Sequence, residues 1–487
     1  MVFNSTDFIF AFLPLAFVLY VVLCKLRPGA FVIGGLIACS LFYYAWWKID
    51  YLPILLLSLL VNFVLGQLVA PNGQRSDFTR VCFLRAGLVL NLSVLGFFKY
   101  MNFFFDTANS VLQTEYAGWG KFALPLGISF FTFQQIAYLV DAYKGLVCEK
   151  DFKVYSLYVL FFPHLIAGPL VLHADLIPQL KDETRQKLQF DNVARGLFLF
   201  SIGLFKKVVI ADHLGPYVGV GFTSPDELGC LDAWLTSLMY ALQLYFDFSG
   251  YCDMAIGVAE MFNIHLPINF NSPYKARNIQ EFWRRWHITL SNFLRDYVYI
   301  PLGGSQNAAS RTSLNLMITF LLGGLWHGAG WTFLFWGFLH GAAIVVFRMY
   351  SLLHFRMPRI AAWFLTFQFV NIAWVFFRAE TWGNAVAILR RMYGRKGIVL
   401  PEVWKDPLSA LEPLGITFGN YVYANEDLMF LVPLVVSGLL VVVFCRNSWQ
   451  LRERFQPTWT YLAITYLLFL ISILDMNKAS VFLYYDF

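Results

Sequence analysis

Charged residues are scarce in this sequence. Only 14% of its 487 residues are Asp, Glu, Lys or Arg, and 59% are hydrophobic, whereas an ordinary soluble domain has about 25% charged residues. This composition excludes an intrinsically disordered protein, a coiled coil and a nucleic-acid-binding protein. The mean hydropathy of +0.59 instead predicts an integral membrane protein.

The familiar catalytic and metal-binding motifs are missing as well. The sequence has no C-x-x-C pair, no H-x-x-x-H, no P-loop, no G-x-S-x-G and no dinucleotide fingerprint. We therefore expect neither a bound metal nor a permanently bound cofactor. The N-terminal apolar run lacks a basic leader and an A-x-A cleavage site, so we interpret it as a first membrane span.

Long apolar runs recur along the whole sequence. They predict an all-α polytopic membrane protein, organised as one domain over residues 1–487, with about 11–12 transmembrane helices and additional re-entrant or interfacial helices. The expected spans lie near 7–24, 30–47, 52–70, 82–104, 122–140, 154–172, 192–211, 233–255, 313–330, 331–347, 360–377, 428–445 and 458–475. Of these, 154–172 contains two prolines and a glycine in FFPHLIAGPL, which favours a broken segment that does not cross.

The loops differ in charge, which indicates their orientation. Residues 212–232 carry acidic residues and no Lys or Arg, whereas residues 275–311 carry six Lys and Arg against two acidic residues. Because cytoplasmic loops collect positive charge, we expect 212–232 outside and 275–311 inside.

Polar residues within apolar runs mark the first candidate region, 240–278. Gln243 and Asp247 share one helical face, as do Asp253 and Glu260. Two interpretations stay open for this region: a polar seam that holds helices together, or a face that lines a substrate path.

The second candidate region is EFWRRWHITLSNFLRD, which begins at Glu281. Its periodicity predicts one amphipathic helix with Arg284, His287 and Ser291 on a common face and an i, i+4 pair between Glu281 and Arg285. An interfacial helix anchored by Trp and Arg explains most of this pattern. It does not explain the histidine.

The third candidate region surrounds His327. Gly323, Gly324, Gly328 and Gly330 flank it in an otherwise apolar run, so backbones can approach closely and leave room for a slim ligand. A histidine hydrogen-bonded between helices is the alternative. A structural role is expected for the other histidines, His164, His173, His213, His265, His340 and His354.

Taken together, these segments resemble the membrane-bound O-acyltransferases, in the bacterial branch that includes the alginate O-acetylation protein AlgI and the teichoic-acid D-alanylation protein DltB. The resemblance covers almost the whole chain and rests on SLFYYAWW, LPLGISFFTFQQIAYLVDAYKG, FFPHLIAGPL, LQLYFDFSGYCDMAIG, FWRRWH, GLWHG and the tail FLYYDF. One departure is His164, which stands where the family often has Gln.

The resemblance implies helices packed around a thin waist, with a funnel from each side. The family's invariant histidine maps onto His327 and its second histidine onto His287. The implied reaction moves an acetyl group from cytoplasmic acetyl-CoA across the bacterial inner membrane. A periplasmic partner of the SGNH-esterase type would then acetylate an exopolysaccharide or cell-wall glycan, with alginate, cellulose and peptidoglycan all open.

The residues fit that chemistry. His327 would act as a general base or carry the acetyl group itself, and His287 would polarise the carbonyl or orient the acceptor. The donor's phosphates require cations, which we expect from a basic cluster consisting of Lys275, Arg277, Arg284 and Arg285.

Two alternatives from other classes remain. A polytopic transporter explains the spans and the polar residues, but it explains neither FWRRWH nor GLWHG, and the sequence shows no inverted repeat. A scaffold that holds a periplasmic enzyme at an export machine is the other alternative.

Overall fold

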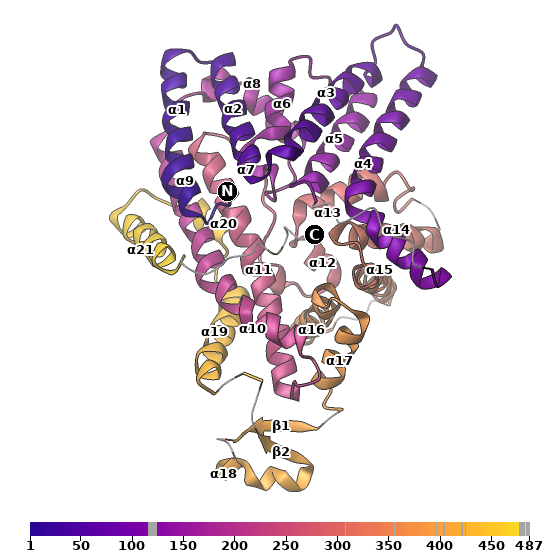
Figure 1. The fold of residues 1–487 in the computed structure, drawn as a ribbon, viewed down its shortest axis with the longest axis vertical. Coiled ribbons are helices and arrows are strands. Elements are labelled where there is room, and N and C mark those ends of the chain that lie inside the picture. Colours follow the sequence, from indigo (N-terminus) through magenta and orange to yellow (C-terminus); the bar gives the residue numbers. More distant parts are fainter. Residues whose placement is uncertain are drawn as a thin grey trace.

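A computed structural model describes residues 1–114, 124–306, 308–353, 357–395, 397–402, 405–419, 422–423, 425–476 and 483. Helices dominate it (Figure 1), which confirms the expected all-α class. The first half contains α1 (Leu13–Leu26), α2 (Ala30–Trp47), α3 (Leu52–Val69), α4 (Asp77–Leu112), α5 (Ile128–Tyr143), α6 (Phe152–Leu160), α7 (Phe162–Leu165), α8 (His173–Lys181), α9 (Phe190–Phe205), α10 (Asp212–Thr223) and α11 (Cys230–Met261). The second half contains α12 (Ile279–Trp283), α13 (Ile288–Leu294), α14 (Ala309–His327), α15 (Trp331–Leu352), α16 (Arg359–Arg378), α17 (Trp382–Met392), α18 (Lys405–Leu408), α19 (Asn425–Phe444), α20 (Ser448–Glu453) and α21 (Trp459–Asp475).

Seven helical segments in the described part of the chain are long and apolar enough to cross a membrane. They are Asp7–Leu26, Ala30–Trp47, Ile49–Val69, Asp77–Leu112, Trp331–Leu352, Arg359–Arg378 and Asp427–Phe444. Most expected spans outside this set are also helical, but α5, α9 and α21 are shorter, and 154–172 is helical only in part. The structure therefore confirms a polytopic helical protein, and the total of 11–12 crossings stays a prediction.

Helix α11 forms the centre of the molecule. Every residue from 239 to 264 is buried, and in Figure 1 the helix runs through the middle, with α9 and α10 beside it. Such complete burial explains why its polar residues need partners from neighbouring helices, since an unpaired buried charge is costly.

Helices α9 and α11 are in backbone contact. A Cβ at Gly203 would lie 2.5 Å from the carbonyl oxygen of Gly250, so only glycine permits this approach. The polar residues of α11 are paired at this interface. A π-helical turn, Lys206–Ala211, follows α9; Lys206 Nζ lies 2.6 Å from Asp253, and Lys207 Nζ lies 2.7 Å from Asp247.

Further along α11, Glu260 lies 3.2 Å from Arg195 and also pairs with Arg452 of α20. Three acidic residues of the first candidate region thus bind basic side chains of adjacent elements. These contacts favour the polar-seam interpretation over a substrate-lining face.

The segment 154–172 is broken, as its prolines predict. Helix α6 ends at Leu160, α7 is a single turn, and the chain then runs without helix to Leu172 while staying buried. A hydrogen bond from the Leu170 N–H to the Thr289 hydroxyl oxygen, 3.0 Å, ties it to the start of α13.

One small sheet interrupts the helical pattern. Strand β1 (Ile398–Pro401) pairs in parallel with β2 (Ile416–Gly419), with Ile398 opposite Ile416. With α18 it forms a lobe that projects from one end of the molecule (Figure 1). The lobe belongs to the long connection between α17 and α19.

Candidate active site

The second candidate region is not one helix. Helix α12 ends at Trp283, α13 begins at Ile288, and His287 between them has φ +43°. The prediction of a continuous amphipathic helix is therefore wrong, and Arg284, His287 and Ser291 do not share a helical face. The pairing of Arg285 with Glu281 is confirmed, with an N···O distance of 2.8 Å.

Hydrogen bonds from a distant segment cause this break. The Asn271 N–H donates to the Arg285 carbonyl oxygen at 2.9 Å, and the Ile288 N–H donates to the Asn269 carbonyl oxygen at 3.0 Å. These bonds replace helical ones on either side of His287 and hold it in the left-handed region, where non-glycine residues are uncommon. The turn therefore places His287 at a fixed point in the core.

His327 is the last residue of α14 and is 2% exposed. The glycines around it let α14 and α15 touch, because a Cβ at Gly324 would lie 2.4 Å from the Phe333 carbonyl oxygen. Close approach is thus as expected. The room for a slim ligand that the glycines predicted is not present beside Gly328, because a Cβ there would lie 2.2 Å from the Phe333 ring.

The structure brings the two predicted catalytic histidines together. The ring centres of His287 and His327 lie 6.3 Å apart, although the residues are 40 positions apart in the sequence. Aromatic rings surround the pair: those of Trp326, Trp336 and Phe377 lie 5.0, 5.1 and 5.2 Å from His327. The pair is thus buried in apolar surroundings, where electrostatic interactions are stronger than in water.

Sequence reasoning missed one basic residue at this site. Lys99 of α4 donates hydrogen bonds from its ammonium group to the Trp326 carbonyl oxygen and, at 3.4 Å, to the hydroxyl oxygen of Ser129. Its only signal in the sequence was a single lysine within the apolar run GFFKYMNFFF.

The basic cluster predicted to bind the donor divides in two. Arg277 and Arg284 are exposed and line a groove of about 630 Å³ together with Glu281, Tyr350 and Arg359. Sequence reasoning had not included Arg359, which joins from the start of α16. Three guanidinium groups around one groove form a surface suited to phosphate.

Arg285 and Lys275 have other partners. Arg285 pairs with Glu281 and also donates to the Asn271 carbonyl oxygen at 3.2 Å. Lys275 donates to the Cys445 carbonyl oxygen, and partial burial lowers the pKa of its ammonium group. Neither residue lines the groove. Arg277 and Arg284 are therefore better placed than these two to bind the phosphates of the acetyl donor.

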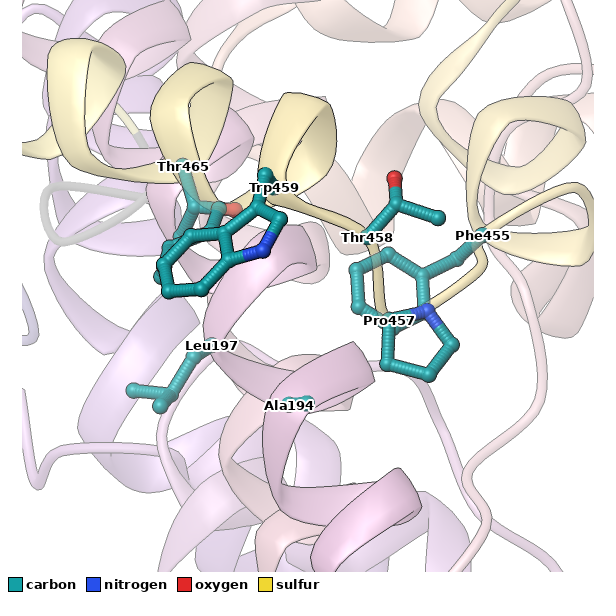
Figure 2. A pocket seen from close by; sticks show the side chains of 8 residues that line it. Ala194, Leu197, Phe455, Pro457, Thr458, Trp459 and Thr465 are labelled. Atoms are coloured by element: carbon teal, nitrogen blue, oxygen red, sulfur yellow. The ribbon is translucent and has the colours of Figure 1, made fainter.

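The other histidines and grooves are distinct from this pair. His340 is fully buried, and its Nδ1 accepts a hydrogen bond from the Trp283 indole at 3.2 Å. His164 is buried beside Gln134, and His354 lies outside the described residues. An apolar groove of about 480 Å³ between α9 and α21 (Figure 2) has neither His287 nor His327 in its lining.

Comparisons with known proteins show the family of this chain. Residues 83–380, which include both histidines, match the model of MBOAT, the membrane-bound O-acyltransferase family. A peptidoglycan O-acetyltransferase of Helicobacter pylori is 44% identical, covering 100% of this chain and 98% of its own. A probable alginate O-acetylase AlgI of Azotobacter vinelandii is 40% identical over 85% of this chain and 82% of its own.

A more distant relative is the teichoic acid D-alanyltransferase of Bacillus subtilis, which is 27% identical over 52% of this chain and 69% of its own. These relatives are all named as transferases or acetylases of an acyl group. The family model covers more than half of this chain, and the two more similar relatives match most of it. The chain therefore belongs to the membrane-bound O-acyltransferase family and is an acyltransferase.

Proposed function

We propose that this acyltransferase takes an acetyl group from cytoplasmic acetyl-CoA and passes it across the inner membrane for O-acetylation of a glycan, through a periplasmic partner of the SGNH type. Peptidoglycan is the first candidate acceptor and alginate the second. The observation that carries the proposal is the placement of two features on one turn: Arg284 in the basic groove and, three residues later, His287 in the buried histidine pair.

Acetyl-CoA matches these two features. It has phosphates at one end and a thioester at the other, so its binding requires cations and its cleavage requires a base or nucleophile. Arg277, Arg284 and Arg359 supply the cations at the groove. His327 supplies the base, or accepts the acetyl group itself, in surroundings that exclude water.

The choice of acceptor rests on the relatives. The likeness to a peptidoglycan O-acetyltransferase extends over the whole of this chain, and the probable alginate O-acetylase is 40% identical over a shorter part. Both acceptors are polysaccharides with hydroxyl groups that form acetyl esters. The partner outside the membrane is part of the proposal: it would receive the acetyl group on the side opposite acetyl-CoA, where these glycans lie.

The proposal is tested with the full chain purified into proteoliposomes and supplied with radiolabelled acetyl-CoA. We expect thioester cleavage and label on peptidoglycan fragments when periplasmic extract is added to the other side. His265→Ala, which changes an exposed histidine, serves as the matched control. Label on alginate oligomers alone would make alginate the acceptor in place of peptidoglycan, and absence of thioester cleavage would overturn acetyl-CoA as the donor.

A further inference from the structure

Asn269 lies at the centre of a hydrogen-bond network beside His287. The residue is 1% exposed. Its side-chain oxygen contacts the Thr289 hydroxyl at 2.7 Å, the Thr289 main-chain nitrogen at 3.2 Å and His287 Nδ1 at 3.3 Å. On the other side of the amide, Nδ2 donates to the sulfur of Cys252 at 3.4 Å.

These contacts fix the orientation of the amide. The main-chain N–H of Thr289 can only donate, so the side-chain atom that faces it must be the carbonyl oxygen of Asn269. The reversed amide would set an NH₂ group against the main-chain N–H of Thr289 and leave that buried N–H without an acceptor. Such a loss is unfavourable by about 1–3 kcal/mol.

The orientation of the amide in turn fixes the proton of His287. An amide oxygen only accepts hydrogen bonds, so His287 Nδ1 has to carry the hydrogen. No carboxylate among the described residues forms an ion pair with His287, which is fully buried, and a charged ring without a counter-ion would be costly. In the neutral ring, Nε2 therefore keeps its lone pair.

The Nε2 atom is buried and has no hydrogen-bond partner among the residues that the structure describes. Buried polar atoms normally have one. An acceptor without a donor, within a buried pair of rings whose centres are 6.3 Å apart, is the position in which a ligand's hydroxyl group would complete the network.

We propose that Asn269 is a positioning residue that holds His287 with its proton on Nδ1, and that Nε2 of His287 accepts a hydrogen bond from a hydroxyl group of the acceptor that does not itself react, which leaves the hydrogen of the reacting hydroxyl to His327. This inference rests on the proposed acetyl transfer. It also separates the two roles open to His287 from the sequence. A neutral ring with its only N–H bound to Asn269 has no hydrogen to donate to a carbonyl, so His287 orients the acceptor and does not polarise the thioester.

The tautomer is measured directly by solid-state NMR on the full chain in lipid bilayers, with ¹⁵N-labelled histidine. The difference between wild type and His287→Ala identifies the His287 signals. At neutral pH we expect Nδ1 of His287 to be protonated and Nε2 to be unprotonated. A bare Nδ1 with a protonated Nε2, or a ring protonated at both nitrogens, would overturn the inference.

The functional consequence is measured on three variants. Asn269→Ala should lower kcat for acetyl transfer by about 10²-fold, the loss expected when a group that orients the acceptor is misplaced, with little change in KM for acetyl-CoA. Asn269→Asp keeps an acceptor oxygen but adds a buried negative charge beside His287, so the ring should become protonated at both nitrogens and the rate should stay low. Thr289→Val removes a hydroxyl from the same network but keeps the main-chain N–H, so it should leave the tautomer unchanged.

Equal losses in Asn269→Ala and Thr289→Val, or a wild-type rate in Asn269→Asp, would assign Asn269 a purely structural role and overturn the inference. The NMR result does not depend on turnover. If the chain does not consume acetyl-CoA, the proposed function fails while the tautomer can still be observed. If it does consume acetyl-CoA and His287 has the opposite tautomer, only the present inference fails.

Discussion

The ammonium group of Lys99 donates a hydrogen bond to the main-chain carbonyl of Trp326 and lies 5.5 Å above the centre of the Trp326 ring. The carbonyls in the last turn of a helix have no partner within the helix and carry partial negative charge. Lys99 therefore binds the C-terminal end of α14, one residue before His327. Helix α4 is linked in this way to the position of His327, the residue proposed to be catalytic.

Replacement of Lys99 should weaken catalysis through this contact. Lys99→Met retains the apolar stem and removes the charge, so we expect a loss of helix-end stabilisation of about 0.3–1 kcal/mol and a lower kcat. Lys99→Arg should preserve most of the activity. Single-turnover kinetics in proteoliposomes measure the effect, and full activity in Lys99→Met would show that the end of α14 is held without it.

Replacement of each of the two histidines should reduce acetyl transfer by a different amount. His327→Ala removes the proposed base and should reduce acetyl transfer by about 10²–10⁴-fold, whereas His287→Ala should do less because it orients the acceptor. Acetyl-ester content of the glycan is the measurement, with protein level as a check on folding. A greater loss in His287→Ala would reverse the two roles.

The basic groove should determine affinity for the donor. Arg284→Ala and Arg277→Ala each remove a guanidinium from the groove, and we expect KM for acetyl-CoA to rise with kcat nearly unchanged. Arg295→Ala is the matched control, because Arg295 pairs with its neighbour Asp296 and is not among the groove's lining residues. Equal KM values for all three variants would remove the groove from donor binding.

Close contact between α14 and α15 should be sensitive to a single methyl group. Gly324→Ala places Cβ 2.4 Å from the Phe333 carbonyl oxygen, and overpacking of this kind typically destabilises a protein by about 1–3 kcal/mol. Gly330→Ala is the control, because its nearest neighbour would be 3.5 Å away. Thermal unfolding in detergent should separate the two, and equal melting temperatures would contradict the close contact.

The sequence predicted the local features of this protein better than the long-range ones. Apolar runs predicted the helices, the prolines predicted the break after Leu160, and the spacing of Glu281 and Arg285 predicted their pair. The positive φ of His287 had no such signal, because Asn269 and Asn271 cause it from another segment. Apart from the family resemblance, no pattern in the sequence predicts that His287 and His327 lie close together in space.

The helix interface that contains Lys206 and Lys207 has a consequence for the biogenesis of the protein. Lys206 meets its acidic partner on α11, Asp253, only after 47 more residues have been synthesised, whereas Lys207 can already pair with Asp212, five residues ahead. A lone lysine in the hydrocarbon core is unfavourable by about 2.5–3.5 kcal/mol on insertion scales. Helix α9 should therefore wait at the translocon or in the headgroup region and enter the bilayer together with α11.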